Sequence, residues 1–376
     1  MIPLCKPYID QKELNALKTV LESGWLTDGP KNLEFETAFS KYIGVKKAIT
    51  LNSCTSALQL AIEALGITGE IILPSFTFVA SANAIVKAGA SPIFVDIDYR
   101  TCNIDPDKIE DKITPRTQAL MPVHFGGQSC QMDKIMTLAK KYKLHLIEDS
   151  AETIGGEFKG QKTGSFATGC FSFFPTKNMT TGEGGMLTTN DLDVAEKIKT
   201  LAGHGIKKRA HHQEKETKPW IRDASLAGYN FRLSSLLAAI GIEQLKKIDK
   251  MNHLRREHAS YLNQKLNFDE IDLPYEDEEC KHVYQMYTLK LKQGDRTQFV
   301  QKLHSKGIGA SVHFDPPVHL QTFYKQYYGY KEGDLPITEQ ISKEIVTLPM
   351  YPGLTQYNLD YMIKTIGTIL LKLKKE

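Results

Sequence analysis

Two chemically active side chains stand directly after short apolar runs. Asp149 closes the run "LHLIED" (144–149), and Lys177 follows the run "CFSFF" (170–174). Short runs of this kind are typical of buried strands, so the carboxylate and the amine are both expected at strand ends. Lysine is normally a solvated surface residue. Its place after a buried run therefore raises the question of a chemical role.

A third feature is a predicted anion site. The stretch "NSCTSAL" (52–58) puts Thr55 and Ser56 in a turn that opens a helix. Free backbone N–H groups and the helix dipole favour an anion such as phosphate at this position. Ser172, which precedes Lys177 in the next motif, adds a further hydroxyl. We therefore expect a phosphate site, a buried acid and a buried lysine to lie together at the mouth of one cleft.

Pyridoxal 5′-phosphate (PLP) needs all three groups. Its aldehyde forms a Schiff base with a lysine amine, its pyridinium nitrogen needs a carboxylate to stay protonated, and its phosphate needs hydrogen-bond donors. We predict that Lys177, Asp149 and the Thr55/Ser56 turn fill these roles. Taken singly, each feature has a plainer explanation as an ion-pair partner, a solvated lysine or a helix N-cap. Their ordered combination favours the cofactor.

The elements that must position these groups alternate along the first two-thirds of the chain. Strand candidates rich in β-branched or aromatic residues lie at 46–51, 70–73, 92–96, 118–122, 144–149, 170–174 and 186–189. Helix-period segments such as 55–65 and 132–142 lie between several of them. This alternation predicts an α/β fold with a mostly parallel sheet and helices on both faces. Ligands of such sheets bind at the carboxyl ends of the strands.

The last third of the chain has a different pattern. One long helix is predicted over 234–266, with charge increasing toward its end, and it could bridge two domains. Beyond it, a smaller α+β domain is indicated by the segments 283–291, 296–307 and 359–375. We therefore predict a large cofactor-binding domain over residues 1–245 and a smaller C-terminal domain over residues 246–376.

Composition limits the class of partner. The chain has 376 residues, of which 41% are hydrophobic and 24% charged, and its net charge is only +3. This balance argues against nucleic acid or a membrane surface as the main partner. The start "MIPLCKPYID" has no signal-peptide pattern, so a cytoplasmic protein is expected. Six cysteines without metal-type spacing predict reduced thiols and no metal site.

Several longer motifs occur in a fixed order: "NSCTSALQLA", "ILPSFTFVASANAI", "IEDSAETIGG", "FSFFPTKNMTTGEGGM" and "GYNFRLSSLLAAIG". Together they resemble the DegT/DnrJ/EryC1/StrS family of PLP-dependent sugar aminotransferases, over nearly the whole chain. The resemblance implies the aspartate-aminotransferase-like fold type I. That fold has a large domain with a mixed, mostly parallel seven-stranded sheet and a smaller α+β C-terminal domain. It also implies a homodimer with shared active sites.

The resemblance also assigns residues. Lys177 is similar to the Schiff-base lysine and Asp149 to the pyridinium partner. The other matches are Phe78 to the aromatic that stacks on the cofactor ring, Thr55, Ser56 and Ser172 to phosphate contacts, and Asn230 to an asparagine that reaches the neighbouring subunit's phosphate. From the sequence alone, Phe78 also fits plain core packing, and Asn230 also fits a residue that fixes a turn.

Glu152 departs from a common pattern of the family. It stands where many members have Gln or His near the phenolic oxygen of the cofactor, although Glu also occurs there. A carboxylate beside a phenolate would repel it. We therefore expect Glu152 to be neutral or turned toward the substrate.

The implied reaction moves an amino group from L-glutamate to a keto group of a nucleotide-diphosphate-linked sugar, for amino-sugar biosynthesis. Lys177 would act first as Schiff-base former and then as acid and base. Lys207, Lys208 and Arg209 form a basic stretch that fits a diphosphate but also fits a solvated loop. His313 and His319, on a Pro-rich turn, either border the substrate or cap the turn.

Three alternatives remain from the sequence. A related branch of the family catalyses sugar dehydration with the same cofactor, but the lysine is replaced by histidine there. A non-catalytic PLP-binding regulator would not need the intact set of Lys177, Asp149 and the phosphate turn. A dinucleotide-dependent oxidoreductase would show a GxGxxG fingerprint after the first strand, where "NSCTSA" stands instead.

Overall fold

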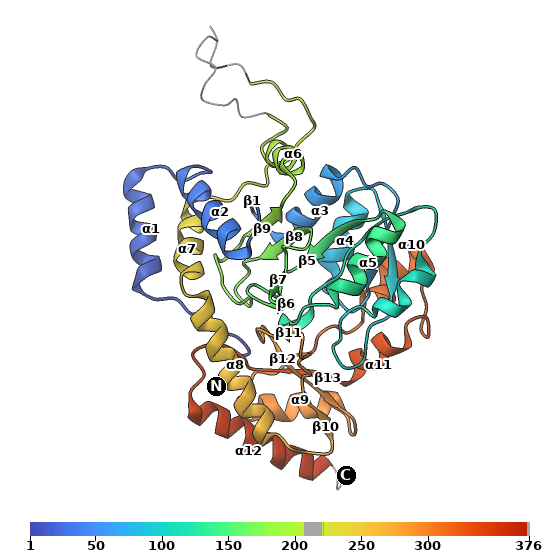
Figure 1. Cartoon of the computed structure of the whole chain (residues 1–376). Coiled ribbons are helices and arrows are strands. Elements are labelled where there is room, and N and C mark those ends of the chain that lie inside the picture. The colour runs from blue at the N-terminus through green and yellow to red at the C-terminus, as the bar shows by residue number, and fades with distance from the viewer. Residues whose placement is uncertain (207–219, 221, 374–376) are drawn as a thin grey trace.

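The computed structural model describes residues 1–206, 220 and 222–373. Within this part of the chain, the main sheet has seven strands in the order β1-β9-β8-β5-β4-β2-β3 (Figure 1). In that order their bounds are Lys47–Leu51, Gly185–Thr189, Thr168–Ser172, His145–Asp149, Thr117–Leu120, Glu70–Pro74 and Ser91–Val95. Each of the seven predicted strands is present. β9 is antiparallel to both neighbours and the other pairs are parallel, which confirms the mixed, mostly parallel sheet.

Helices cover both faces of this sheet because successive strand residues point to opposite sides. On one face, Leu51, Leu73 and Leu187 pack in a core with α3 (Cys54–Ala64), α4 (Val79–Lys87) and α6 (Leu192–Ala202). On the other face, Phe171 and Met186 pack against α2 (Pro30–Ile43) and α7 (Ser235–Leu245). α5 (Met132–Tyr142) covers the same face beside β4 and β5. α1 (Gln11–Ser23) packs against α7.

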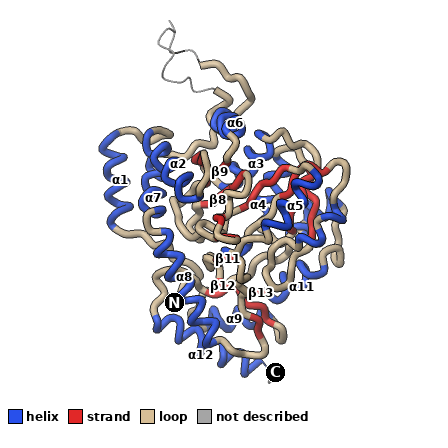
Figure 2. The backbone as a smooth tube through the Cα atoms, in the orientation of Figure 1, coloured by secondary structure: helices blue, strands red, loops and turns tan. Residues whose placement is uncertain are grey.

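The C-terminal part builds a separate core. Its small sheet has the order β10-β12-β13 (Ile271–Asp272, Tyr287–Leu291, Ile345–Leu348) and lies beside α8, α9 and α12 (Ile248–Lys265, Arg296–Ser305, Gln356–Leu373), as Figure 2 shows. Ile2, from the start of the chain, is buried in this core and bridges to Ile308. The domain division at residue 245 stays a prediction.

The two parts are also joined by smaller elements. A three-stranded ribbon pairs β11 (Cys280–Lys281) with β6 and β7 (Glu157–Phe158, Gln161–Lys162) of the loop that follows β5. α10 (Thr322–Tyr328) and α11 (Pro336–Glu344) return to the large sheet. There, Tyr324 of α10 donates a hydrogen bond to Asn83 of α4 at 2.7 Å. None of the helices in the described ranges combines the length and apolar character needed to cross a bilayer.

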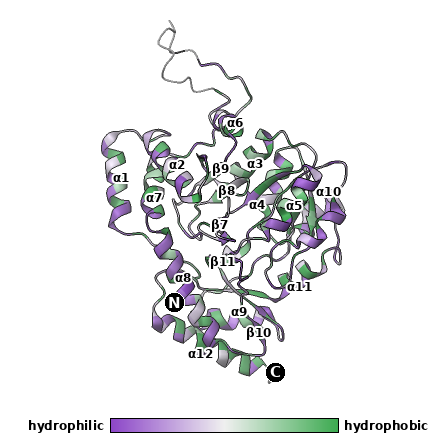
Figure 3. Ribbon diagram, in the orientation of Figure 1, coloured by the Kyte–Doolittle hydropathy of each residue, from purple (hydrophilic) through white to green (hydrophobic). Residues whose placement is uncertain are grey.

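The single long helix predicted over 234–266 is wrong. The segment forms two helices, α7 and α8, which end and begin on either side of Lys246 and Lys247. Lys247 forms ion pairs with Asp10 and with Glu13, a residue of α1 that is only 1% exposed. A buried carboxylate needs a cationic partner, and Lys247 supplies it at the break. α8 is largely hydrophilic, as Figure 3 shows, which agrees with the predicted rise in charge.

Asp96 caps α11 from outside that helix. It follows β3 and accepts hydrogen bonds from the backbone N–H of Ile337 at 3.0 Å and from the N–H and hydroxyl of Thr338, each at 2.7 Å. Burial alone would raise the pKa of Asp96, but these hydrogen bonds hold it below its ordinary value. The helix start has no side-chain cap of its own, so Asp96 anchors α11 to the large sheet.

We expect Asp96→Asn to lower the free energy of unfolding at pH 7 by about 2–4 kcal/mol, because charge-assisted hydrogen bonds are lost in a buried site. A lowered pKa stabilises the fold above the ordinary carboxyl pKa, and this contribution disappears as pH falls through the folded-state value. The gap between variant and wild type should therefore shrink below about pH 4. Urea unfolding at several pH values measures it. The exposed Asp107 gives the control Asp107→Asn, expected within about 0.5 kcal/mol of wild type; an equal loss in both variants contradicts the anchoring role.

Candidate active site

The candidate site is a cavity of about 400 Å³ at the carboxyl edge of the large sheet. It receives Asp149 from the end of β5, Ser172 from the end of β8 and Lys177 from the turn after β8. Thr55 in the first turn of α3 and Phe78 directly before α4 complete it. With Glu152 and His313, seven of the residues predicted from the sequence thus lie around one cavity.

Glycines let strand β9 approach the start of α3. A Cβ atom added at Gly185 would lie 2.3 Å from the carbonyl carbon of Ser53, so no larger residue fits between the two backbones. Gly184 has φ +154°, a conformation that other residues rarely adopt, and it lines the cavity. The "GEGG" stretch therefore lets the backbone of β9 pack closely against the start of α3 and forms part of the cavity wall.

Asp149 is only 4% exposed and its carboxylate is held on both oxygens. Ser81 in the first turn of α4 donates to Oδ2 at 2.7 Å, and the backbone N–H of Ala151 donates to Oδ1 at 3.2 Å. The oxygen of Ser81 lies 2.9 Å from the hydroxyl of Thr77. Burial raises the pKa of Asp149, and the hydrogen bond from Ser81 opposes that rise. A buried carboxylate in this state is suited to a cationic N–H donor.

Lys177 and Glu152 form the second polar centre. Lys177 Nζ donates to Glu152 Oε1 at 3.1 Å, and the backbone N–H of Gly126 donates to Glu152 Oε2 at 2.9 Å. The side chains of Lys177 and Glu152 are 16% and 10% exposed. Because the amine is largely removed from solvent and faces the cavity, it is placed to react with a bound carbonyl group.

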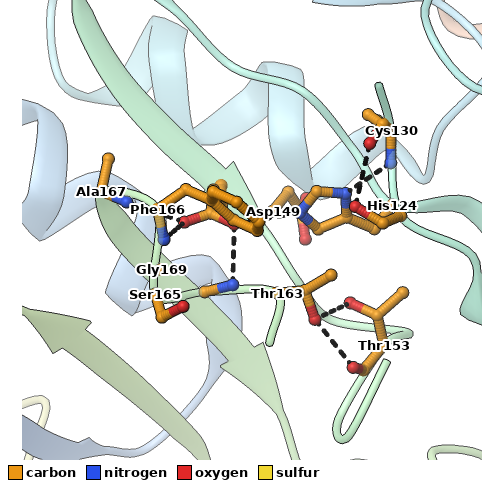
Figure 4. Close-up of polar contacts among 12 residues, drawn as sticks. His124, Cys130, Asp149, Thr153, Thr163, Ser165, Phe166, Ala167 and Gly169 are labelled. Atoms are coloured by element: carbon orange, nitrogen blue, oxygen red, sulfur yellow. Dashed lines mark hydrogen bonds and ion pairs between the residues drawn. The ribbon is translucent and has the colours of Figure 1, made fainter. Parts of the chain in front are cut away.

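The loop that carries Glu152 is ordered by a buried carboxylate on the opposite side of β5. Glu148 is 0% exposed and accepts from the backbone N–H groups of Gly164, Phe166 and Ala167 at 2.7–2.9 Å. His124 Nε2 lies 3.2 Å from the same carboxylate. The His124 ring accepts at Nδ1 from the backbone N–H of Cys130 (Figure 4), so Nε2 carries the proton that it donates to Glu148.

A side-chain contact closes the same loop on itself. The hydroxyl of Thr163 lies 3.0 Å from that of Thr153 and 2.9 Å from the Thr153 carbonyl oxygen, as Figure 4 also shows. The backbone N–H of Thr163 donates to Gly156. The backbone between Asp149 and β8 is thereby fixed, and with it the position of Glu152.

Of the hydroxyl groups at the start of α3, some cap the helix and one lines the cavity. Ser53 is the N-cap and accepts from the backbone N–H of Ser56 at 3.1 Å. The Ser56 hydroxyl donates to Asn52 at 2.7 Å, and Ser56 is not among the cavity-lining residues. Thr55 is exposed and lines the cavity. The first backbone N–H groups of the helix lack intrahelical acceptors, so Thr55 and these groups suit a phosphate.

The remaining predicted residues differ in their placement. His313 lines the cavity, and its Nδ1 lies 2.7 Å from the hydroxyl of Thr347. Burial lowers the pKa of His313, which keeps its ring neutral near pH 7. Phe78 is 63% exposed and lines the cavity, so it is not a core residue in this chain. Lys207, Lys208 and Arg209 lie outside the described residues.

Two predicted residues lie away from the cavity. His319 is fully buried, with Nδ1 2.7 Å from the hydroxyl of Ser75 and Nε2 3.2 Å from Glu339. It therefore joins α11 to the end of β2. Asn230 is exposed, and its side-chain oxygen accepts two hydrogen bonds from the guanidinium of Arg232. Its predicted contact with a neighbouring subunit stays a prediction.

Sequence reasoning missed three contributors: Ser81, Gly126 and Glu148. Ser81 stands in the first turn of a helix, where a hydroxyl usually serves the backbone; only the fold directs it to Asp149. Gly126 acts through its backbone, which leaves no side-chain signal. The adjacent acids Glu148 and Asp149 at the end of an apolar run were the available clue, because alternate strand residues must point to opposite faces.

These features test whether the residues present fit the cofactor. A shielded lysine, a buried carboxylate that suits a cationic N–H, an anion-binding helix start and an exposed aromatic side chain supply one partner for each part of PLP. The described cavity, about 400 Å³, is also large enough for a cofactor of this size. The fold and the site define a PLP-dependent enzyme of fold type I.

Comparison with known proteins gives the family. The profile of the DegT/DnrJ/EryC1/StrS aminotransferase family matches residues 7–367. The chain is 39% identical to the spore coat polysaccharide biosynthesis protein SpsC of Bacillus subtilis, over 98% of this chain and 97% of SpsC. It is 37% identical to the GDP-perosamine synthase of Caulobacter vibrioides, over 98% of each chain. The chain belongs to the DegT/DnrJ/EryC1/StrS aminotransferase family.

Solved structures agree with this assignment. Spr1654 of Streptococcus pneumoniae, in its pyridoxamine phosphate (PMP) form, superposes with a TM-score of 0.94 at 28% identity, covering 99% of this chain and 100% of that one. The same protein has also been solved in a PLP form. The protein described here is a PLP-dependent aminotransferase.

We expect Ser81→Ala to weaken PLP binding about tenfold, because Asp149 loses a hydrogen bond that favours its charged form. Fluorescence titration of the cofactor-free chain measures this affinity. Ser81→Thr keeps the hydroxyl and should bind PLP close to wild type. Equal affinities for Ser81→Ala and wild type would show that Ser81 does not support Asp149.

Proposed function

We propose that this protein is a sugar aminotransferase that transfers the amino group of L-glutamate to a keto group of a nucleotide-diphosphate-linked sugar, for amino-sugar biosynthesis. The observation that carries the proposal is the shielded Lys177 amine, which lies 3.1 Å from Glu152 in the same cavity as Asp149. The similarity to a GDP-perosamine synthase over 98% of the chain supports a nucleotide sugar as the acceptor.

Each residue has a defined task in this proposal. When bound, PLP carries the amino group and withdraws electrons from the substrate carbon. Asp149 accepts the pyridinium N–H and keeps the ring protonated. Thr55, Ser172 and the first turn of α3 bind the phosphate, with Ser56 holding that turn in place. Phe78, which lines the same cavity, would pack against the ring.

Lys177 is the residue that moves the proton. Its amine would hold the cofactor at rest and would be free while the amino group is transferred. The free amine would accept the proton from the Cα atom of the donor and then release it to the carrier, which restores the amine. Glu152 accepts a hydrogen bond from this amine and keeps it beside the cavity. His313, which is neutral in this environment, borders the space left for the substrate.

The other parts of the proposal concern the surroundings of the site. We propose a homodimer in the cytoplasm, in which Asn230 contacts the cofactor phosphate of the neighbouring subunit. The exposure of Asn230 and the open face of Phe78 support this arrangement. Lys207, Lys208 and Arg209 are proposed to bind the diphosphate of the sugar nucleotide.

A dehydratase is the second candidate, but the presence of a lysine at position 177 favours amino transfer, since this branch of the family replaces it with histidine. A non-catalytic PLP-binding regulator is disfavoured because the lysine, the buried acid and the helix start meet in one cavity. The amino donor test below separates these functions.

We expect the visible band of the PLP-loaded protein to bleach when L-glutamate is added, because the amino group moves to the cofactor. Lys177→Ala should keep the fold, as judged by circular dichroism, but should form no amino sugar in the presence of glutamate and a keto-sugar nucleotide. Wild type provides the matched control. A band that is stable to glutamate would overturn the donor assignment, and turnover by Lys177→Ala would overturn the role of the lysine.

A further inference from the structure

Glu152 faces the Lys177 amine as an ionised carboxylate. Lys177 Nζ donates to Glu152 Oε1 at 3.1 Å, and the backbone N–H of Gly126 donates to Oε2 at 2.9 Å. Both oxygens of Glu152 thus accept hydrogen bonds from N–H groups, whereas a protonated carboxyl group would offer a donor on one of them. Gly126 therefore fixes a charged Glu152 beside the amine.

This ion pair is largely shielded from water. The side chains of Lys177 and Glu152 are 16% and 10% exposed, and within the described residues each has its ion pair with the other alone. An opposite charge within about 4–6 Å favours the charged form of a group, and the effect grows where water is excluded. The Glu152 carboxylate therefore favours a positive charge on the nitrogen that it contacts.

Three other ionisable groups near this pair are uncharged. Burial lowers the pKa of His313, so that its ring is neutral near pH 7. Burial also raises the pKa of the Cys5 and Cys54 thiols, which keeps both of them protonated. None of these three groups therefore offsets a positive charge on Lys177.

The charged groups nearby act in different directions. Arg255, which is 2% exposed, and the exposed Lys6 line a small pocket together with the reactive lysine, and both oppose a positive charge there. Glu183 lines the large cavity but is exposed, so solvent screens its charge. Under the proposed function the charge of Asp149 is matched by the pyridinium N–H. Glu152 is then the carboxylate left to offset a charge on the lysine nitrogen.

We propose that Glu152 keeps the nitrogen of Lys177 protonated while that nitrogen is bonded to the cofactor. The inference rests on the proposed function, in which Lys177 carries PLP through a C=N bond. Glu152 contacts this same nitrogen, and Gly126 fixes the carboxylate from its other oxygen. A proton on the nitrogen makes the bonded carbon more reactive toward an amino donor. Glu152 thus extends the reactive state of the loaded protein to higher pH.

The test follows the visible band of the PLP-loaded, full-length protein as the pH is raised, because the band changes when the nitrogen loses its proton. Glu152→Gln removes the charge and keeps the shape of the side chain. Its pH midpoint should lie about 1–2 pH units below that of wild type, the effect of losing one nearby opposite charge. The matched control is Glu183→Gln, which removes an exposed carboxylate of the same cavity and should keep the wild-type midpoint.

The other outcomes overturn the inference. Equal midpoints in wild type and Glu152→Gln, or a band that stays constant in both, would show that Glu152 does not hold the proton, and the proposed function would be unaffected. Equal falls in Glu152→Gln and Glu183→Gln would show an effect of net charge alone. A wild-type band that also forms in Lys177→Ala would overturn the proposed role of the lysine and the inference together.

Further variants remove the dependence on the folding of Glu152→Gln. Glu152→Met is also neutral and should show the same fall, whereas Glu152→Asp keeps the charge and should stay closer to wild type. Cyanoborohydride gives a second readout, because it delivers hydride to the carbon of a protonated C=N bond and leaves a secondary amine on Lys177 that mass spectrometry detects. At alkaline pH this reduction should be faster in wild type than in either neutral variant; equal rates would contradict the role of Glu152.

Discussion

The site depends on two adjacent carboxylates that β5 buries at its end. Burying a carboxylate costs several kcal/mol unless hydrogen bonds or opposite charges compensate. Glu148 and Asp149 are 0% and 4% exposed and, as neighbours on a strand, point to opposite faces. The two carboxylates are compensated differently, so that Glu148 has a structural role and Asp149 is left available to a ligand.

Glu148 is compensated within the protein. Three backbone N–H groups of the following loop donate to it, and His124 lies beside it. The loop is therefore shaped around the carboxylate, and Glu152 takes its position from that loop. Asp149 has fewer donors and its pKa is raised by burial. Asp149 also lines the cavity, so a cationic group of a ligand bound there would complete its hydrogen bonding.

The strands were predictable from the sequence because each short apolar run coincides with a strand of the large sheet. Asp149 and Lys177 were predictable for the same reason, since both follow such runs. The break between α7 and α8 was not, because it depends on the buried Glu13 of a distant helix. The roles of Ser81 and Gly126 were not predictable either. Ser81 contacts a residue of another element, and Gly126 acts through its backbone N–H. The position of His319 could not be predicted either. It lies in a Pro-rich turn, which has no periodic pattern from which the direction of a side chain could be inferred.

The lysine loop is held by the smaller part of the protein as much as by the sheet. Gln285 donates to Thr176, and the side chain of Asn178 donates to Asn252 of α8 at 2.7 Å and to the carbonyl oxygen of Val283 at 3.3 Å. Thr176 and Asn178, which these partners hold, are the two neighbours of Lys177 in sequence. Lys177 thus sits on a backbone that is held on both sides, so under the proposed function only its side chain would need to move.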